Sequence, residues 1–263
     1  MAVFSSCASY VRFEHVVCRK LRYVRPKDIE EFLQTVLATA RKREQVLKGG
    51  TLLWRAQSGY TDRLSSKSAD LEVYVPGPHP PDRMEPFADR ALEGRASPKG
   101  IPVLYLSIER DTALTEMRPA LRSTISVAQF AVVKDLRIID CSFDSAGTPL
   151  WPQYLVVNGN EADLSLMMAE PSPDERERSV WTDIDIAFAK PIDRSDYLAS
   201  YAPTQITAEL FKSEGYDGIK YRSALRETGH NVALFDLGAA KIDPTSCALF
   251  EATKIDFEFR EIT

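Results

Sequence analysis

The chain has 263 residues, of which 44% are hydrophobic and 27% charged, so it can bury one large core or two small ones. Its formal net charge is −5, which makes its surface as a whole unsuited to bind nucleic acid or an anionic membrane. A signal-peptide pattern is missing, and no apolar run reaches the about 20 residues that a membrane span needs. These features predict a cytoplasmic protein that contacts neither membrane nor nucleic acid directly.

Four cysteines and three histidines are scattered along the chain. None of them forms a CxxC pair or has the spacing typical of zinc or haem ligands, so the sequence predicts no metal site. Free thiols are also typical of a reducing compartment. We expect that no cofactor is required.

Residues 1–49 are predicted to form an N-terminal extension with one amphipathic helix. That helix has Asp28 and Glu31 at capping-box spacing, then an apolar stripe, and Gly49-Gly50 are expected to stop it. The basic run 19–22 before the helix has two interpretations. It is a solvated surface, or it binds a phosphate or the acidic face of a partner.

Residues 50–263 are predicted to form the catalytic domain. The segment TLLWRA (51–56) is typical of a strand with Leu53 and Arg55 on one face, whereas 57–93 lacks periodicity and is predicted to be a surface loop. VLYLSIE (103–109) is predicted to be a strand with Tyr105 facing away from its leucines. The helix that follows, DTALTEM, contains Glu116 and has Asp111 or Thr112 as its expected cap.

The second half of the domain mixes strands and helices. The segments 124–133 and 136–140 are predicted to form an antiparallel pair, 141–180 an insertion, and 183–189 an alternating strand. A helix is expected over 202–215, followed by the final core strands DGIKYRS and NVALFD. This order favours an α+β fold of short, mainly antiparallel strands with flanking helices, and it argues against a Rossmann sheet.

Several polar residues lie among apolar ones and are candidates for a site. Arg55 directly follows Trp54, and an inward guanidinium needs an anion such as a pyrophosphate, although an edge-strand arginine can also reach solvent or a structural carboxylate. Arg95, in the loop before the Tyr105 strand, is a second phosphate contact or a solvated loop residue. Tyr105 offers a ring that stacks on a base, or it belongs to the core.

Three further candidates follow the same logic. Glu116 is a catalytic carboxylate or a helix-surface residue that gains a little from the helix dipole. Ser223 ends a strand, where its hydroxyl can reach a cleft, but without a GxSxG motif a covalent role is not expected. Asn231, at the start of the last strand, orients a ligand amide or caps a turn.

Four blocks spread over about residues 50–236 resemble the RES domain family. They are LLWRAQ, GRASPKGIPVLYLS, DTALTEMRP and YAPTQITAELFKSEGYDGIKYRSALRETGHNVALF. The family is named for its signature Arg, Glu and Ser, which by position are Arg55, Glu116 and Ser223. Tyr105 and Asn231 match the tyrosine and the asparagine of the family pattern.

The resemblance implies an ADP-ribosyltransferase-like core and an enzyme that degrades NAD+ as a glycohydrolase or phosphorylase. It also implies a bacterial growth-arresting toxin with a helix-turn-helix antitoxin as its partner. NAD+ is then a substrate, and inorganic phosphate is a second possible reactant. Two alternatives stay open, namely an ADP-ribosyltransferase that modifies a macromolecule and a non-enzymatic module that binds a nucleotide or partner.

Overall fold

The computed structural model describes residues 2–67, 72–87, 89, 91–143, 156–157, 160–161, 171–190 and 198–256. Among these residues, a nine-stranded sheet consists of β1 (Glu44–Leu47), β2 (Leu52–Ser58), β5 (Leu104–Ser107), β6 (Thr124–Val132), β7 (Leu136–Asp140), β10 (Gly218–Arg222), β11 (His230–Leu234), β12 (Ala240–Ile242) and β13 (Ala248–Glu251). The strand order is β1-β7-β10-β11-β5-β2-β6-β12, and β13 also pairs with β6. Every pairing between these described strands is antiparallel except that of β7 with β10.

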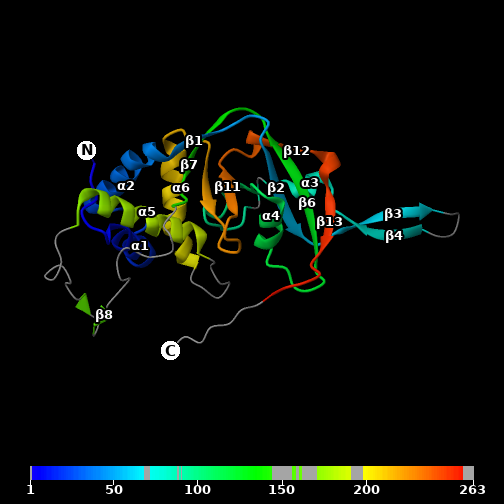
Figure 1. Ribbon diagram of the computed structural model, residues 1–263, viewed down its shortest axis with the longest axis horizontal. Helices are drawn as coiled ribbons and strands as arrows, with labels where there is room; N and C mark the ends of the chain where they lie inside the picture. The colour runs from blue at the N-terminus through cyan, green and yellow to red at the C-terminus, as the bar shows by residue number, and fades with distance from the viewer. Residues whose placement is uncertain are drawn as a thin grey trace.

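Helices cover one end of this sheet and leave the other end more open (Figure 1). The described helices are α1 (Ser9–Arg19), α2 (Lys27–Ala40), α3 (Pro81–Met84), α4 (Arg110–Glu116), α5 (Pro173–Ala189) and α6 (Ala202–Ser213), with short 3₁₀ turns at Arg41–Arg43, Leu198–Tyr201, Leu237–Ala239 and Pro244–Ser246. α1, α2, α5 and α6 bury a shared core that includes Phe13, Leu33, Trp181 and Phe211. No helix within the described ranges is both long and apolar enough to cross a bilayer. The predicted α+β class, with mainly antiparallel strands and an N-terminal helical part, is confirmed.

The N-terminal extension differs from its prediction. It contains two helices instead of one, because the segment before α2 forms α1 and buries Phe13, Val16 and Val17. The N-cap residue of α1 is Ala8, which has no side chain that can cap the helix, so the sequence lacks the usual signal for a helix start. In addition, α2 ends at Ala40 and β1 follows it, pairing with β7. The extension therefore supplies an edge strand to the same sheet.

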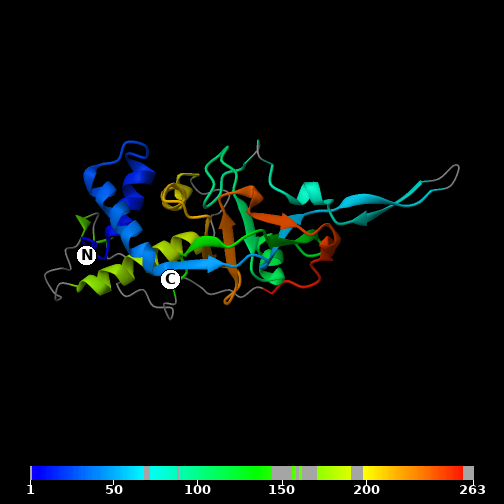
Figure 2. The ribbon, with the colours of Figure 1, turned by 90° about the horizontal axis from the view of Figure 1, so that it is seen from above.

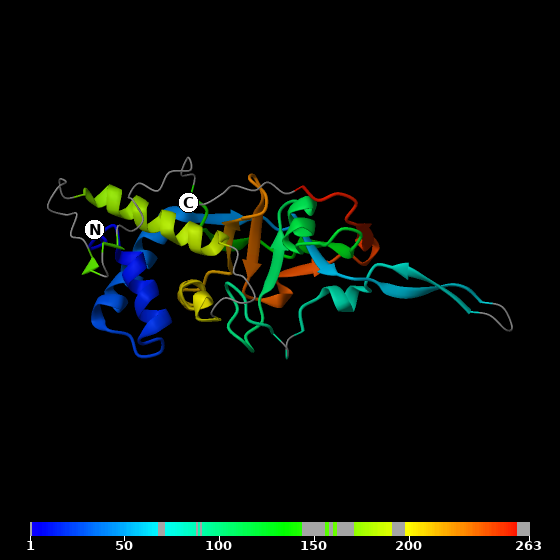
Figure 3. The same ribbon diagram turned by 90° about the horizontal axis from the view of Figure 1, so that it is seen from below.

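The segment 57–93, predicted to be a loop, contains a hairpin of β3 (Thr61–Lys67) and β4 (Glu72–Gly77) as well as α3. The hairpin projects from the body of the molecule (Figures 2 and 3). Its apolar side chains, such as Leu64 and Tyr74, stay exposed. Because neither face is buried, the strands show no apolar–polar alternation, and the sequence pattern was that of a loop.

Two further strand predictions are wrong. β6 does not pair with β7, because β6 lies between β2 and β12 while β7 lies between β1 and β10. Residues 183–189 are not a strand but the last turns of α5, whose Trp181, Ile184 and Phe188 are buried at helical spacing. A Ser172–Glu175 capping box starts this helix. Much of the predicted insertion 141–180 lies outside the described residues. Its described parts are residues 141–143, the short pair β8 (Val156–Val157) with β9 (Asn160–Glu161), and residues 171–180, which include the start of α5.

Candidate active site

The centre of the sheet brings the candidate residues together from segments far apart in sequence. The strands β10, β11, β5 and β2 are neighbours in that order. Arg55 lies on β2, Asn231 on β11, and Ser223 directly follows β10. Glu116 is the last residue of α4, which packs against β2, β5 and β11. The strand order therefore brings these four residues near one another at the centre of the sheet.

Glu116 is held by two donors on one carboxylate oxygen. The Ser223 hydroxyl donates to Glu116 Oε1 at 2.7 Å, and Asn231 Nδ2 donates to the same oxygen at 2.7 Å. Ser223 Oγ itself accepts the backbone N–H of Leu225 at 3.1 Å, which leaves its hydrogen for the carboxylate. Among the described residues, Oε2 of Glu116 accepts no hydrogen bond. One oxygen is thus fixed and the other is left for a ligand.

Arg55 is a part-buried residue, and the described residues around its guanidinium compensate its charge poorly. Its Nη1 donates to the backbone carbonyl of Tyr105 at 3.0 Å, while its Nε has no hydrogen-bond partner among the described residues. Burial lowers the pKa of Arg55 to about 10, so the side chain stays protonated at neutral pH. A part-buried cation that has no carboxylate partner in the described part of the chain is a strong candidate for binding an anionic ligand.

Arg55 and Glu116 line one cavity of about 530 Å³. Trp54, Tyr105 and Tyr221 also line it. Its size lies in the range usual for small-molecule sites. Asn231 also lines the cavity, whereas Ser223 reaches it through its hydrogen bond to Glu116. The Arg55 guanidinium and the Glu116 carboxylate therefore share one cavity, and the Ser223 hydroxyl contacts that carboxylate without lining the cavity.

The family model for the RES domain matches residues 71–257, well over half of the chain. The chain belongs to the RES domain family. The matched range includes Tyr105, Glu116 and Ser223, whereas Arg55 precedes its first residue and joins the site through the pairing of β2 with β5.

One solved structure that resembles this RES protein is described as the crystal structure of the M. tuberculosis MbcT–MbcA toxin–antitoxin complex. The two chains are 14% identical, and the likeness covers 83% of this chain and 92% of that chain at a TM-score of 0.40. No curated protein matches the chain.

In this RES domain, Tyr105 organises the loop before its own strand. Its hydroxyl accepts the N–H of Ala96 at 2.9 Å and pairs with Ser97 Oγ at 2.9 Å. Gly94 lies in the same loop and has no room for a side chain, because a Cβ at this position would lie 2.8 Å from the tyrosine oxygen. Tyr105 therefore lines the cavity with its hydroxyl already engaged by the protein.

We expect Tyr105→Phe to lower the free energy of unfolding by about 1–2 kcal/mol, because it leaves the buried N–H of Ala96 without its acceptor. Urea unfolding measures the change. The matched control is Tyr74→Phe, whose exposed hydroxyl bonds only to the exposed Glu72 among the described residues and whose loss should cost less than about 0.5 kcal/mol. Equal costs for the two variants would contradict the organising role of Tyr105.

Arg95 lines the cavity but is partly engaged elsewhere. Its Nη2 donates to the carbonyls of Ala189 at 3.1 Å and Lys190 at 3.0 Å, which are C-terminal carbonyls of α5. Its guanidinium also lies 5.8 Å from the ring centre of Tyr221. The structure thus gives Arg95 a helix-capping role that the loop pattern did not predict.

Two residues of the site were missed from sequence. Ser107 donates to Asn231 Oδ1 at 2.7 Å and so fixes the amide whose nitrogen contacts Glu116. Gln205 of α6 donates to the carbonyl of Gly94 at 3.0 Å and so fixes the loop before β5, in which Gly94 lines the cavity. Ser107 lies on the same strand face as Tyr105, so strand alternation was a usable signal. Gln205 gave none, because its contact depends on how α6 packs.

Proposed function

We propose that this RES domain cleaves the nicotinamide–ribose bond of NAD+. The observation that supports this best is the pair of opposite charges in one cavity, namely a carboxylate held at one oxygen by two donors and a part-buried arginine that has no carboxylate partner among the described residues. A dinucleotide with a cationic nicotinamide and an anionic pyrophosphate needs both groups at some distance from each other.

Glu116 supplies the charge that the reaction needs. Breaking the bond develops positive charge on the anomeric carbon, as in glycoside hydrolysis, and a fixed carboxylate stabilises that charge more in the transition state than in the substrate. Nicotinamide leaves as a neutral molecule from a cationic precursor, so it needs no general acid. Ser223 and Asn231 orient the carboxylate, and the remaining lone pair of the serine can accept from a ribose hydroxyl.

Arg55 binds the pyrophosphate through the N–H groups of its guanidinium that the carbonyl of Tyr105 does not occupy. Tyr105 contributes its ring to the wall beside the nicotinamide end. Arg95 assists Arg55 only with the nitrogens that α5 does not occupy. No cofactor takes part in this scheme.

The decisive experiment is to incubate the purified protein with NAD+ and to measure free nicotinamide with and without inorganic phosphate. Water as the acceptor gives ADP-ribose, and phosphate gives the 1″-phosphate of ADP-ribose. Label that appears on a macromolecule with little free ADP-ribose identifies a transferase instead. Unchanged NAD+ under all conditions rejects the enzymatic proposal and leaves a binding module.

We expect Arg55→Ala to raise KM for NAD+ by about 10–100-fold with a smaller change in kcat, since it removes charge-assisted hydrogen bonds made in substrate and transition state alike. Steady-state kinetics measure both constants. Arg137→Ala is the matched control, because Arg137 also lies on a strand but forms an exposed ion pair with Glu44. A KM for Arg55→Ala within twofold of the parent would exclude the proposed pyrophosphate contact.

The biological role follows from the same activity. Depletion of NAD+ stops growth, which fits the toxin of a toxin–antitoxin pair, and such a protein needs a helix-turn-helix antitoxin that silences it. Growth arrest on expression, relieved by Glu116→Gln and by a co-expressed neighbouring gene product, tests this role. Growth unaffected by the active protein rejects it.

A further inference from the structure

A second cavity, of about 260 Å³, adjoins the first one. The residues that line both cavities are Arg55, Gln57, Arg83, Gly94 and Tyr105. Two of these five shared residues are arginines. The two cavities therefore meet where positive charge is concentrated.

The walls of the second cavity differ from those of the first. They are largely apolar and come from the segment after α3 and from the loop before β5, with Pro86, Phe87, Leu92, Pro102 and Val103 among them. Phe87 is 48% exposed, so part of its surface is open to a ligand. An aromatic ring among apolar walls suits a flat heteroaromatic group.

The charged residues of the second cavity are arranged so that a phosphate is favoured only at the junction. Glu85 and Glu93 line the second cavity but not the first, and their carboxylates repel phosphate while accepting hydrogen bonds from hydroxyl or amino groups. At the junction, Arg83 adds its guanidinium to that of Arg55 and lies 5.9 Å from the centre of the Phe87 ring. Met84, next to Arg83 in α3, is fully buried and anchors this short helix.

From this layout we infer that the second cavity binds the adenosine half of the dinucleotide, with the purine against Phe87 and the pyrophosphate between Arg55 and Arg83. The inference rests on the proposed function, and it adds the orientation of the substrate. The nicotinamide riboside half then lies in the larger cavity beside Glu116, and the two ends of NAD+ are separated by the two arginines.

Kinetic discrimination between NAD+ and nicotinamide mononucleotide tests the inference, because the mononucleotide has the same scissile bond but no adenosine. For Phe87→Ala we expect the ratio of kcat/KM for NAD+ to kcat/KM for the mononucleotide to fall about tenfold, as expected for loss of one base–aromatic contact. Tyr74→Ala removes an exposed aromatic residue from the projecting hairpin and is the matched control, which should keep the parent ratio. An unchanged ratio in Phe87→Ala overturns the inference.

Binding of ADP and of adenosine, measured by calorimetry, separates this inference from the cleavage proposal, since neither ligand has a scissile nicotinamide bond. Phe87→Ala should weaken both ligands about tenfold, whereas Arg83→Gln should weaken ADP and leave adenosine unchanged. This pattern in a protein that does not cleave NAD+ would reject the catalytic role and support the adenosine site. Equal ADP affinity in the parent and in Phe87→Ala, or no ADP binding by the parent, would overturn the adenosine site even if NAD+ is cleaved.

Discussion

Glu116→Gln is expected to lower kcat for nicotinamide release by about 10²–10³-fold, the scale of removing one preorganised electrostatic group. The amide oxygen of glutamine can still accept from Ser223 and Asn231, so the local hydrogen bonds are kept while the negative charge is lost. The charge that develops on the anomeric carbon then has no carboxylate beside it. KM should change much less than kcat, because the pyrophosphate contacts of Arg55 are retained.

Single-turnover release of nicotinamide measures this effect without interference from product dissociation. Glu209→Gln, at an exposed position of α6, is the matched control for the loss of one carboxylate and should retain the parent rate. Thermal unfolding of both variants shows whether the fold is intact. A Glu116→Gln protein that is folded and retains more than about half of the parent rate would remove the carboxylate from the mechanism.

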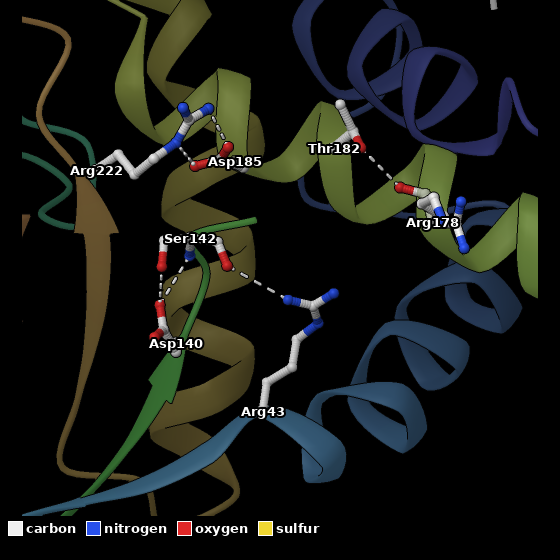
Figure 4. Close-up of polar contacts among 7 residues, drawn as sticks. All are labelled: Arg43, Asp140, Ser142, Arg178, Thr182, Asp185 and Arg222. Carbon is white, nitrogen blue, oxygen red and sulfur yellow. Dashed lines mark hydrogen bonds and ion pairs between the residues drawn. The ribbon is translucent and has the colours of Figure 1, made fainter. Parts of the chain in front are cut away.

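Arg222→Met is expected to lower the free energy of unfolding by about 3 kcal/mol. Arg222 of β10 and Asp185 of α5 form a two-point ion pair, with Nε and Oδ1 3.0 Å apart and a second contact between Nη2 and Oδ2 (Figure 4). Asp185 is fully buried, whereas the Arg222 side chain is 35% exposed. Loss of the arginine leaves a buried carboxylate without its cation, but loss of the carboxylate leaves a cation that can reach water. Asp185→Asn should therefore cost less, about 1 kcal/mol.

The loss of unfolding free energy in Arg222→Met, called the deficit below, should depend on pH. Burial raises the pKa of Asp185 even though Arg222 lowers it, so removing Arg222 raises that pKa further. When the pKa of a carboxyl is higher in the folded protein than its unfolded value of about 3.9, the free energy of unfolding decreases as pH rises through the folded pKa. The deficit should be largest at neutral pH and smaller near the unfolded pKa.

Urea unfolding of the parent, Arg222→Met and Asp185→Asn at neutral and acidic pH measures the stability differences. The same deficit for Arg222→Met at both pH values would show that Asp185 is not the group responsible. A larger cost for Asp185→Asn than for Arg222→Met would contradict the difference in burial on which the prediction depends.

The parts of the fold that were predicted correctly are those set by local pattern. Alternation in VLYLS put Tyr105 opposite Leu104 and Leu106, and these two leucines are indeed buried together with Leu53 of TLLWRA. The helix expected over 202–215 is α6, and Gly215, with a φ of +80°, lies just beyond its last residue. These features need only a few neighbouring residues, so the sequence displays them directly.

The errors occurred where packing outweighs pattern. Ile184, Ile186 and Phe188 alternate like a strand, yet they belong to a helix because α5 begins at a strong capping box and buries a longer stripe. The pairing of β6 with β7 was inferred from nearness in sequence, but both strands found partners elsewhere in the sheet. Short connections favour neighbouring strands without requiring them.

The amino-acid sequence by itself determined which residues are candidates for the site, because Arg55, Glu116 and Ser223 lie in short apolar segments with the marks of a RES domain. Only the tertiary structure decided how these groups are used. The bonds from Ser223 and Asn231 to Glu116 join residues 107 and 115 positions apart, and they exist because β11 lies between β10 and β5. Strand order of this kind is set by the burial of the whole sheet, and that quantity is not encoded in any single segment.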